Sequence, residues 1–156
     1  MPVPITAQLE FIHSIPPDLA GMLESPCHSL GTPRPELAGC KVRVKGTTPI
    51  YVIDRCGYRR LVPFPFTFMN LFKDASVFEG LLVSSTVSDI AEGRALDENS
   101  ILVRGISSET IYLLDSGTKR PISSRRIMDK YDFDERAVVV VPQVLIDAVP
   151  QGELWE

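Results

Sequence analysis

The chain has 156 residues, of which 44% are hydrophobic and 23% charged, and its formal net charge is −4. A chain of this length and composition forms one globular domain or two small ones. The acidic balance argues against general binding to nucleic acid, which requires a basic surface. No run of about 20 apolar residues is present to span a membrane as a helix. Neither a nucleic-acid partner nor a membrane span is therefore expected.

Proline dominates residues 1–38, which hold seven of the 13 prolines. Because proline fixes φ and lacks an N–H donor, this region cannot form one long helix or a central strand. We expect a Pro-rich N-terminal arm with a strand at 8–15 and a short helix at 16–25. The alternative is a partner-binding tail. The arm has no basic start and no unbroken apolar core, which favours a cytoplasmic protein, or one exported without a conventional signal peptide.

One sequence pattern occurs twice, about 60 residues apart. The stretch IYVIDRCGYRR runs from Ile50 to Arg60, and IYLLDSGTKR runs from Ile111 to Arg120. VKG precedes the first stretch at 44–46 and VRG the second at 103–105; LLVSS and VVVVP come later, at 81–85 and 138–142. A register held over about fifty residues predicts an internal duplication. The units predicted are 39–98 and 99–156.

Each unit is predicted to contain a strand, a β-hairpin, a short helix, a further strand and a last short helix. The hairpin turns place Asp before a Gly that favours positive φ. Thr67 is a candidate N-cap for the helix at 66–74, Ser123 or Ser124 for that at 124–132, and Thr86 for that at 86–93. Pro121 should lie in an edge strand. The fold expected is α+β, with two β-rich repeats packed with pseudo-twofold symmetry around one core.

The pattern VRG…IYLLDSGTKRPISS…VVVVP…PQG, over residues 99–152, resembles a tandem module of bacterial secreted and surface proteins. Residues 39–93 resemble it more loosely, because they lack the proline of KRPI. The resemblance implies a binding or attachment unit and does not specify a ligand.

Two pairs of basic residues, Arg59–Arg60 and Lys119–Arg120, lie in the predicted hairpins. Each pair is next to a strand that contains a tyrosine. Arginine can bind two oxygens of a carboxylate, sulfate or phosphate at once. The simpler interpretation is a charged edge that discourages strand addition. The tyrosines are either core residues or rings that stack on a sugar. The candidate ligand-binding residues are Arg59, Arg60, Lys119, Arg120, Tyr51 and Tyr112.

An aromatic run, FPFTFMNLF at 64–72, holds four phenylalanines that cannot all face one core. Phe64 and Phe66 are therefore candidates for an exposed interaction surface. Trp155 either docks into the domain or marks a dimer contact.

The three cysteines, Cys27, Cys40 and Cys56, show no CxxC spacing, and only His13 and His28 are present. We interpret the cysteines as free thiols and expect no metal and no cofactor. The sequence has no GxSxG, HExxH, P-loop or GxGxxG motif. A hydrolase built on a Cys–His pair is a third interpretation, which requires two of these residues to meet in space.

The function expected is that of a non-enzymatic binding module, which recognises a glycan or an anionic polymer through two equivalent sites near Arg60 and Arg120. Two rigidly joined weak sites gain affinity through effective concentration. The alternative is a protein–protein interaction or assembly protein, with a homodimer as one form, that uses the Phe-rich segment and the Pro-rich arm.

Overall fold

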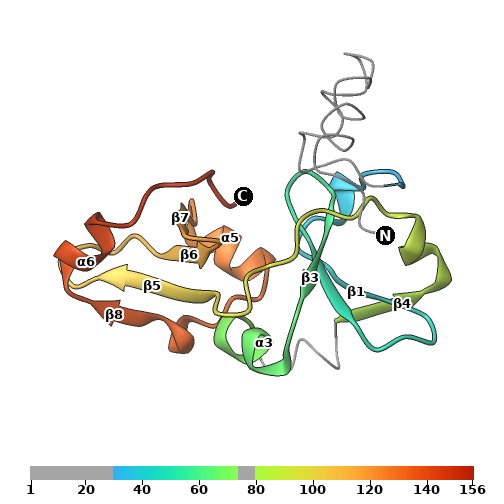
Figure 1. Cartoon of the computed structure of the whole chain (residues 1–156), viewed down its shortest axis with the longest axis horizontal. Coiled ribbons are helices and arrows are strands. Elements are labelled where there is room, and N and C mark those ends of the chain that lie inside the picture. The colour runs from blue at the N-terminus through green and yellow to red at the C-terminus, as the bar shows by residue number, and fades with distance from the viewer. Residues whose placement is uncertain (1–29, 74–79) are drawn as a thin grey trace, which may run out of the picture.

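The computed structural model describes residues 30–73 and 80–156, and it confirms a mixed α+β fold with two four-stranded sheets (Figure 1). Most of the predicted arm, including the strand at 8–15, the helix at 16–25, Cys27 and both histidines, lies outside the described residues. None of the helices in the described part of the chain is long and apolar enough to cross a membrane.

The first sheet has the strand order β3-β2-β1-β4. Its strands are β1 (Lys41–Val44), β2 (Ile50–Ile53), β3 (Arg59–Val62) and β4 (Leu81–Ser84). β2 is antiparallel to β1 and β3, and β4 is parallel to β1. The β2–β3 turn places Gly57 at φ 88°, a conformation that glycine adopts without steric cost.

The second sheet has the order β7-β6-β5-β8 and the same strand directions. Its strands are β5 (Ile101–Gly105), β6 (Tyr112–Asp115), β7 (Thr118–Pro121) and β8 (Val139–Val141). Pro121 lies in β7, the last strand in the order, as its missing N–H predicts.

The strand register corrects one detail of the sequence alignment. Tyr51 pairs with Val42, and Tyr112 pairs with Val103. With the tyrosines as reference, Val42 and not Val44 occupies the place of Val103. The glycine that ends each motif suggested the wrong offset, because Gly46 comes four residues after Val42 whereas Gly105 comes two residues after Val103.

The helix α3 (Pro65–Leu71) begins earlier than predicted. Phe64 is its N-cap, and Pro65 takes the first helical position, where the fixed φ of proline suits a helix start. Thr67 is therefore not a cap; its hydroxyl donates to the backbone oxygen of Glu98 at 2.7 Å.

The helix α5 (Arg125–Lys130) begins at one of the two predicted caps, since the Ser124 hydroxyl accepts from the Ile127 N–H. The predicted helix at 86–93 is the 3-10 helix η2 (Ser85–Asp89), which Ser84 caps in place of Thr86. The remaining elements are η1 (Pro35–Leu37), η3 (Glu135–Ala137) and α6 (Gln143–Asp147).

The main apolar core draws on both sheets. It contains Val52 and Val62 of the first, Leu102 and Leu113 of the second, and the aromatic residues Phe68, Phe72, Tyr131, Phe133 and Trp155. The helix α3 contacts both β3 and β5, and it lies between the two sheets in Figure 1. A smaller core of Val42, Ile53, Val87 and Ile90 belongs to the first sheet alone.

Backbone contacts join the two halves directly. Phe72 and Phe133 form an isolated antiparallel bridge, and their rings stack with centroids 5.3 Å apart. The Lys73 N–H donates to Asp132 O at 2.9 Å, and the Asp134 N–H donates to Leu71 O at 2.8 Å. Each half therefore completes the core and part of the hydrogen bonding of the other.

Because the core is shared, Phe133→Ala should destabilise the whole protein by about 3–5 kcal/mol and not the second half alone. Phe133 is 2% exposed and stacks on Phe72 and Tyr131. Urea unfolding followed by circular dichroism and by Trp155 fluorescence should show one coincident transition at lower denaturant. Leu30→Ala, at a residue 97% exposed, is the control and should shift stability by no more than about 0.5 kcal/mol. Two separate transitions would contradict the shared core.

Candidate functional site

The first members of the basic pairs, Arg59 and Lys119, lie against the two strand tyrosines. The Arg59 guanidinium is 4.7 Å from the ring centroid of Tyr51, and the Lys119 Nζ is 5.1 Å from that of Tyr112. Arg59 Nε donates to Ile90 O at 2.9 Å, and Lys119 Nζ donates to Ile146 O at 2.8 Å. Each cation therefore ties its hairpin to the short helix that closes its half.

The second members, Arg60 and Arg120, meet two aspartates between the sheets. Arg60 reaches Asp54 of its own half at 3.4 Å and Asp115 of the other half at 3.5 Å. Arg120 lies 4.0 Å from the same Asp115 oxygen. All four side chains are 12% exposed or less, so their charges must be paired to be stable there.

The aspartates also hold the turns. Asp54 Oδ1 accepts the N–H groups of Cys56 and Tyr58, each at 3.0 Å. Asp115 Oδ1 accepts the Asp97 N–H at 2.9 Å. Burial, and then the neighbouring Arg60 charge, lower the pKa of the Arg120 guanidinium, and Asp115 opposes that shift. The cluster is thus a set of mutually dependent charges that shape two turns.

Trp155 is docked, in line with one of the two interpretations of the sequence. It is 1% exposed, and the Arg120 guanidinium lies 4.4 Å from its ring. The backbone N–H of Trp155 donates to Pro121 O at 2.8 Å, so the C-terminal segment runs along β7. Burial raises the pKa of the neighbouring Tyr131, whose hydroxyl donates to Glu156 O. In this conformation Trp155 offers no surface to a second chain.

Phe64 and Phe66 lie at the surface, at the start of α3. They are 44% and 49% exposed, and their rings are nearly parallel with centroids 5.3 Å apart. Met69, one turn further along α3, is 64% exposed. We call these three residues the Phe patch. It presents a flat aromatic face and a flexible thioether, which are the side chains that protein interfaces favour.

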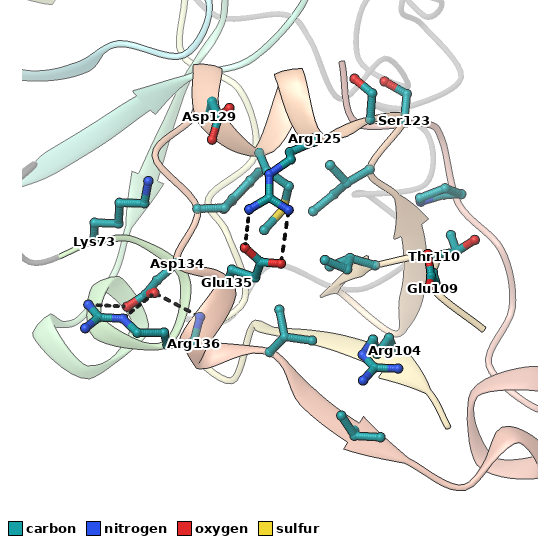
Figure 2. Close-up of a pocket in the computed structure, with 18 of the residues that line it drawn as sticks. Lys73, Arg104, Glu109, Thr110, Ser123, Arg125, Asp129, Asp134, Glu135 and Arg136 are labelled. Carbon is teal, nitrogen blue, oxygen red and sulfur yellow. Dashed lines mark hydrogen bonds and ion pairs between the residues drawn. The ribbon is translucent and has the colours of Figure 1, made fainter. Parts of the chain in front are cut away.

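A groove of about 1340 Å³ lies over the second sheet, between β5, β8, α5 and η3 (Figure 2). Apolar side chains line it, among them Ile111, Ile122 and Val140, and so do four basic and four acidic residues. The charged residues are Lys73, Arg104, Arg125, Arg136, Glu109, Asp129, Asp134 and Glu135. An apolar surface with charges of both signs is more complementary to a polypeptide with apolar and charged side chains than to a uniformly anionic polymer.

Arg125 and Glu135 point toward each other in this groove and form a two-bond ion pair, at 2.7 and 3.4 Å (Figure 2). Their side chains are 76% and 60% exposed, so water screens the pair and it contributes at most about 1 kcal/mol.

Lys41 is a residue whose role the sequence pattern did not reveal. It begins β1, is 1% exposed, and its Nζ donates to Tyr131 O and to Asp132 Oδ2, the latter at 3.1 Å. Burial lowers the pKa of Lys41, against the opposing effect of Asp132. Lys41 pairs with Val52 as Leu102 pairs with Leu113, so an alignment of β1 with β5 by register sets a lysine beside a leucine.

The residues considered for catalysis do not assemble in the part of the chain that the structure describes. Cys40 is half-buried and Cys56 exposed, and both are free thiols. Among residues 30–73 and 80–156 no group of three or more His, Cys, Asp and Glu side chains is placed to hold a metal ion. Cys27, His13 and His28 lie outside these residues.

Comparison with known proteins adds no assignment. No protein-family model, no curated protein and no solved structure matches this chain. Its function is therefore argued from its own residues.

Arg60→Ala should destabilise the fold by about 3–5 kcal/mol, because it leaves Asp54 and Asp115 buried without their shared partner. Thermal and urea unfolding would measure the loss. Arg126→Ala, at an exposed position on α5, is the matched control and should have little effect. An unchanged melting temperature for Arg60→Ala would show that this guanidinium is available to a ligand, as the hairpin sequence suggests.

Proposed function

We propose that this chain is a non-catalytic protein-interaction module whose partner binds over the Phe patch. The observation that carries the proposal is the stacked pair of half-exposed phenylalanine rings beside Met69. Aromatic side chains contribute most to binding when a partner desolvates them at the centre of an interface. An exposed pair held rigid by stacking loses little conformational entropy on binding.

The N-terminus of α3 supports the proposal independently. Phe64 is the N-cap of α3 and makes no side-chain capping bond, whereas Ser124 caps α5 at the corresponding place in the other half. A capping Ser is worth about 0.5–2 kcal/mol relative to a residue that cannot cap. The chain therefore keeps an exposed aromatic ring at a position where a small polar residue would make the fold more stable.

The basic residues weigh against a glycan or polyanion at the two hairpins. Arg60 and Arg120 are engaged with buried aspartates, and Arg59 and Lys119 with tyrosine rings and backbone oxygens. A ligand there would have to break these contacts. This is why we place the partner on α3 and not at the arginines.

We also infer that residues 39–98 and 99–156 are two copies of one unit, packed with pseudo-twofold symmetry. The common strand order and the matched cation–tyrosine contacts support this inference. So does the central cluster, to which each half contributes one Asp and one Arg at the same place in its hairpin. A duplication leaves one copy free to keep Ser124 as a structural cap while the other acquires Phe64.

Phe64→Ser should separate stability from function. The new hydroxyl caps α3, so the melting temperature should rise by about 2–4 °C. Partner binding should weaken at least about tenfold, because a central aromatic contact is lost. Partners would be found by proximity labelling with the wild type and the variant, and their affinities then measured with purified proteins.

Ser124→Ala serves as the matched control: it should lower stability and leave binding intact. Equal affinity of the wild type and Phe64→Ser for every partner would contradict the proposal. A glycan and polyanion screen at low and moderate salt tests the competing function. Salt-sensitive binding of a glycan or polyanion that Arg120→Ala abolishes, without loss of folding, would instead place the binding site at the arginines.

A further inference from the structure

Each sheet has one edge that the chain covers itself. Residues 91–96 run along β3, where the Arg59 N–H donates to Ala91 O at 2.9 Å and the Leu96 N–H donates to Leu61 O at 2.9 Å. Residues 150–155 run along β7, where the Lys119 N–H donates to Pro150 O at 2.8 Å. The other edges are β4 and β8. Within residues 30–73 and 80–156 no further strand or bridge pairs with either of them.

The β8 edge carries no charged residue and no proline that would discourage pairing with another chain. Soluble proteins place charges, prolines or bulges on such strands. Here residues 138–141 are four valines, and Val139 and Val140, which face opposite sides of the sheet, are 45% and 47% exposed. The strand is short, so backbone pairing alone would supply few hydrogen bonds, and side chains would have to supply most of the contact.

Exposed apolar side chains continue from β8 onto the neighbouring segments. Val144 and Leu145 on α6 are 72% and 58% exposed, and Ile106, just past β5, is 69% exposed. The Ile106 N–H donates to Val141 O at 2.9 Å, so these segments are joined. In Figure 1, α6 lies at the end of the molecule away from the first sheet. We call Ile106, Val139, Val140, Val144 and Leu145 the apolar end.

The matching edge in the first half, β4, leads into a polar segment. Leu82 and Val83 of β4 are as exposed as the two valines, at 46% and 45%. The next segment is η2, however, where Ser85, Thr86, Ser88 and Asp89 face the solvent. Only the second half therefore extends an apolar edge strand into an apolar helix surface.

The charge pattern indicates what covers the apolar end. Residues 137–151 contain a single charged residue, Asp147, in a chain that is 23% charged. Such a surface favours a partner that is equally uncharged, since an unpaired charge buried against it would be costly. The same face of another copy meets this requirement, and two-fold contacts of this isologous kind are the commonest among soluble oligomers.

We propose that the apolar end is a homodimer interface, in which β8 and α6 of one copy pack against β8 and α6 of a second copy about a two-fold axis. The antiparallel approach of the two β8 strands places valine against valine and brings no charged side chain of β8 into the contact. Stable interfaces bury about 800 Å² on each partner; the apolar end forms the centre, and the polar residues around it form the rim. The proposal goes beyond the protein-interaction function, because the Phe patch on α3 remains free and each dimer presents two copies of it.

Sedimentation equilibrium of the full chain, from about 1 μM to about 1 mM, tests the dimer. The wild type should convert from monomer to dimer within this range. Val144→Lys and Val139→Lys should each weaken dimerisation at least about 100-fold, since the two-fold axis brings the new charges of both copies into an apolar contact. Circular dichroism and melting curves would verify that both variants remain folded.

Two controls distinguish the proposed dimer from a general effect of an added charge and from partner binding at the Phe patch. Leu82→Lys places the same charge on the equally exposed β4 edge and should leave the dimer intact. Phe64→Ser should also leave it intact, so the loss of partner binding and the loss of dimerisation are distinguishable. A wild type that remains monomeric throughout, or a dimer that only Leu82→Lys or Phe64→Ser disrupts, would overturn the proposal.

Discussion

The ion pair between Arg60 of the first sheet and Asp115 of the second is the contact on which the arrangement of the two halves depends. Buried charges are stable only when paired, so Asp54, Asp115, Arg60 and Arg120 can be buried together but not singly. Asp54 accepts backbone N–H groups in its own hairpin turn, and Asp115 accepts the N–H of Asp97, which precedes β5. The cluster therefore links local turn geometry to the packing of one half on the other, and it engages the very arginines that a sequence pattern offers as ligand sites.

The apolar core imposes the same mutual dependence. A unit of about 60 residues buries a smaller share of its unfolded surface than a larger domain does, and is only marginally stable alone. Here Phe72 and Phe133 bridge the halves, Trp155 returns along β7 to close the aromatic cluster, and Lys41 reaches across to the end of α5. Such a core can lose no single large aromatic residue without a cost to both sheets.

The places where the two halves differ are more informative about function than the places where they agree. The matched positions hold the hairpins and the central charges. The unmatched ones put Phe64 in the place of Ser124 at a helix start, and an apolar α6 in the place of the polar η2. Each difference exposes apolar surface, which is why we propose a partner surface on α3 and a self-association surface on β8 and α6.

The sequence by itself determined much of the local structure: eight strands, the positive-φ glycines of both hairpins, a cap at Ser123 or Ser124 and the edge position of Pro121. These features arise from β-branched runs and from turn, cap and proline chemistry, which act over a few residues. It did not determine that Arg60 and Arg120 are buried, that Lys41 takes the place of Leu102, or that Trp155 is docked. The sequence shows which side chains are charged. Only the tertiary structure decides which charges form pairs and which remain exposed to solvent.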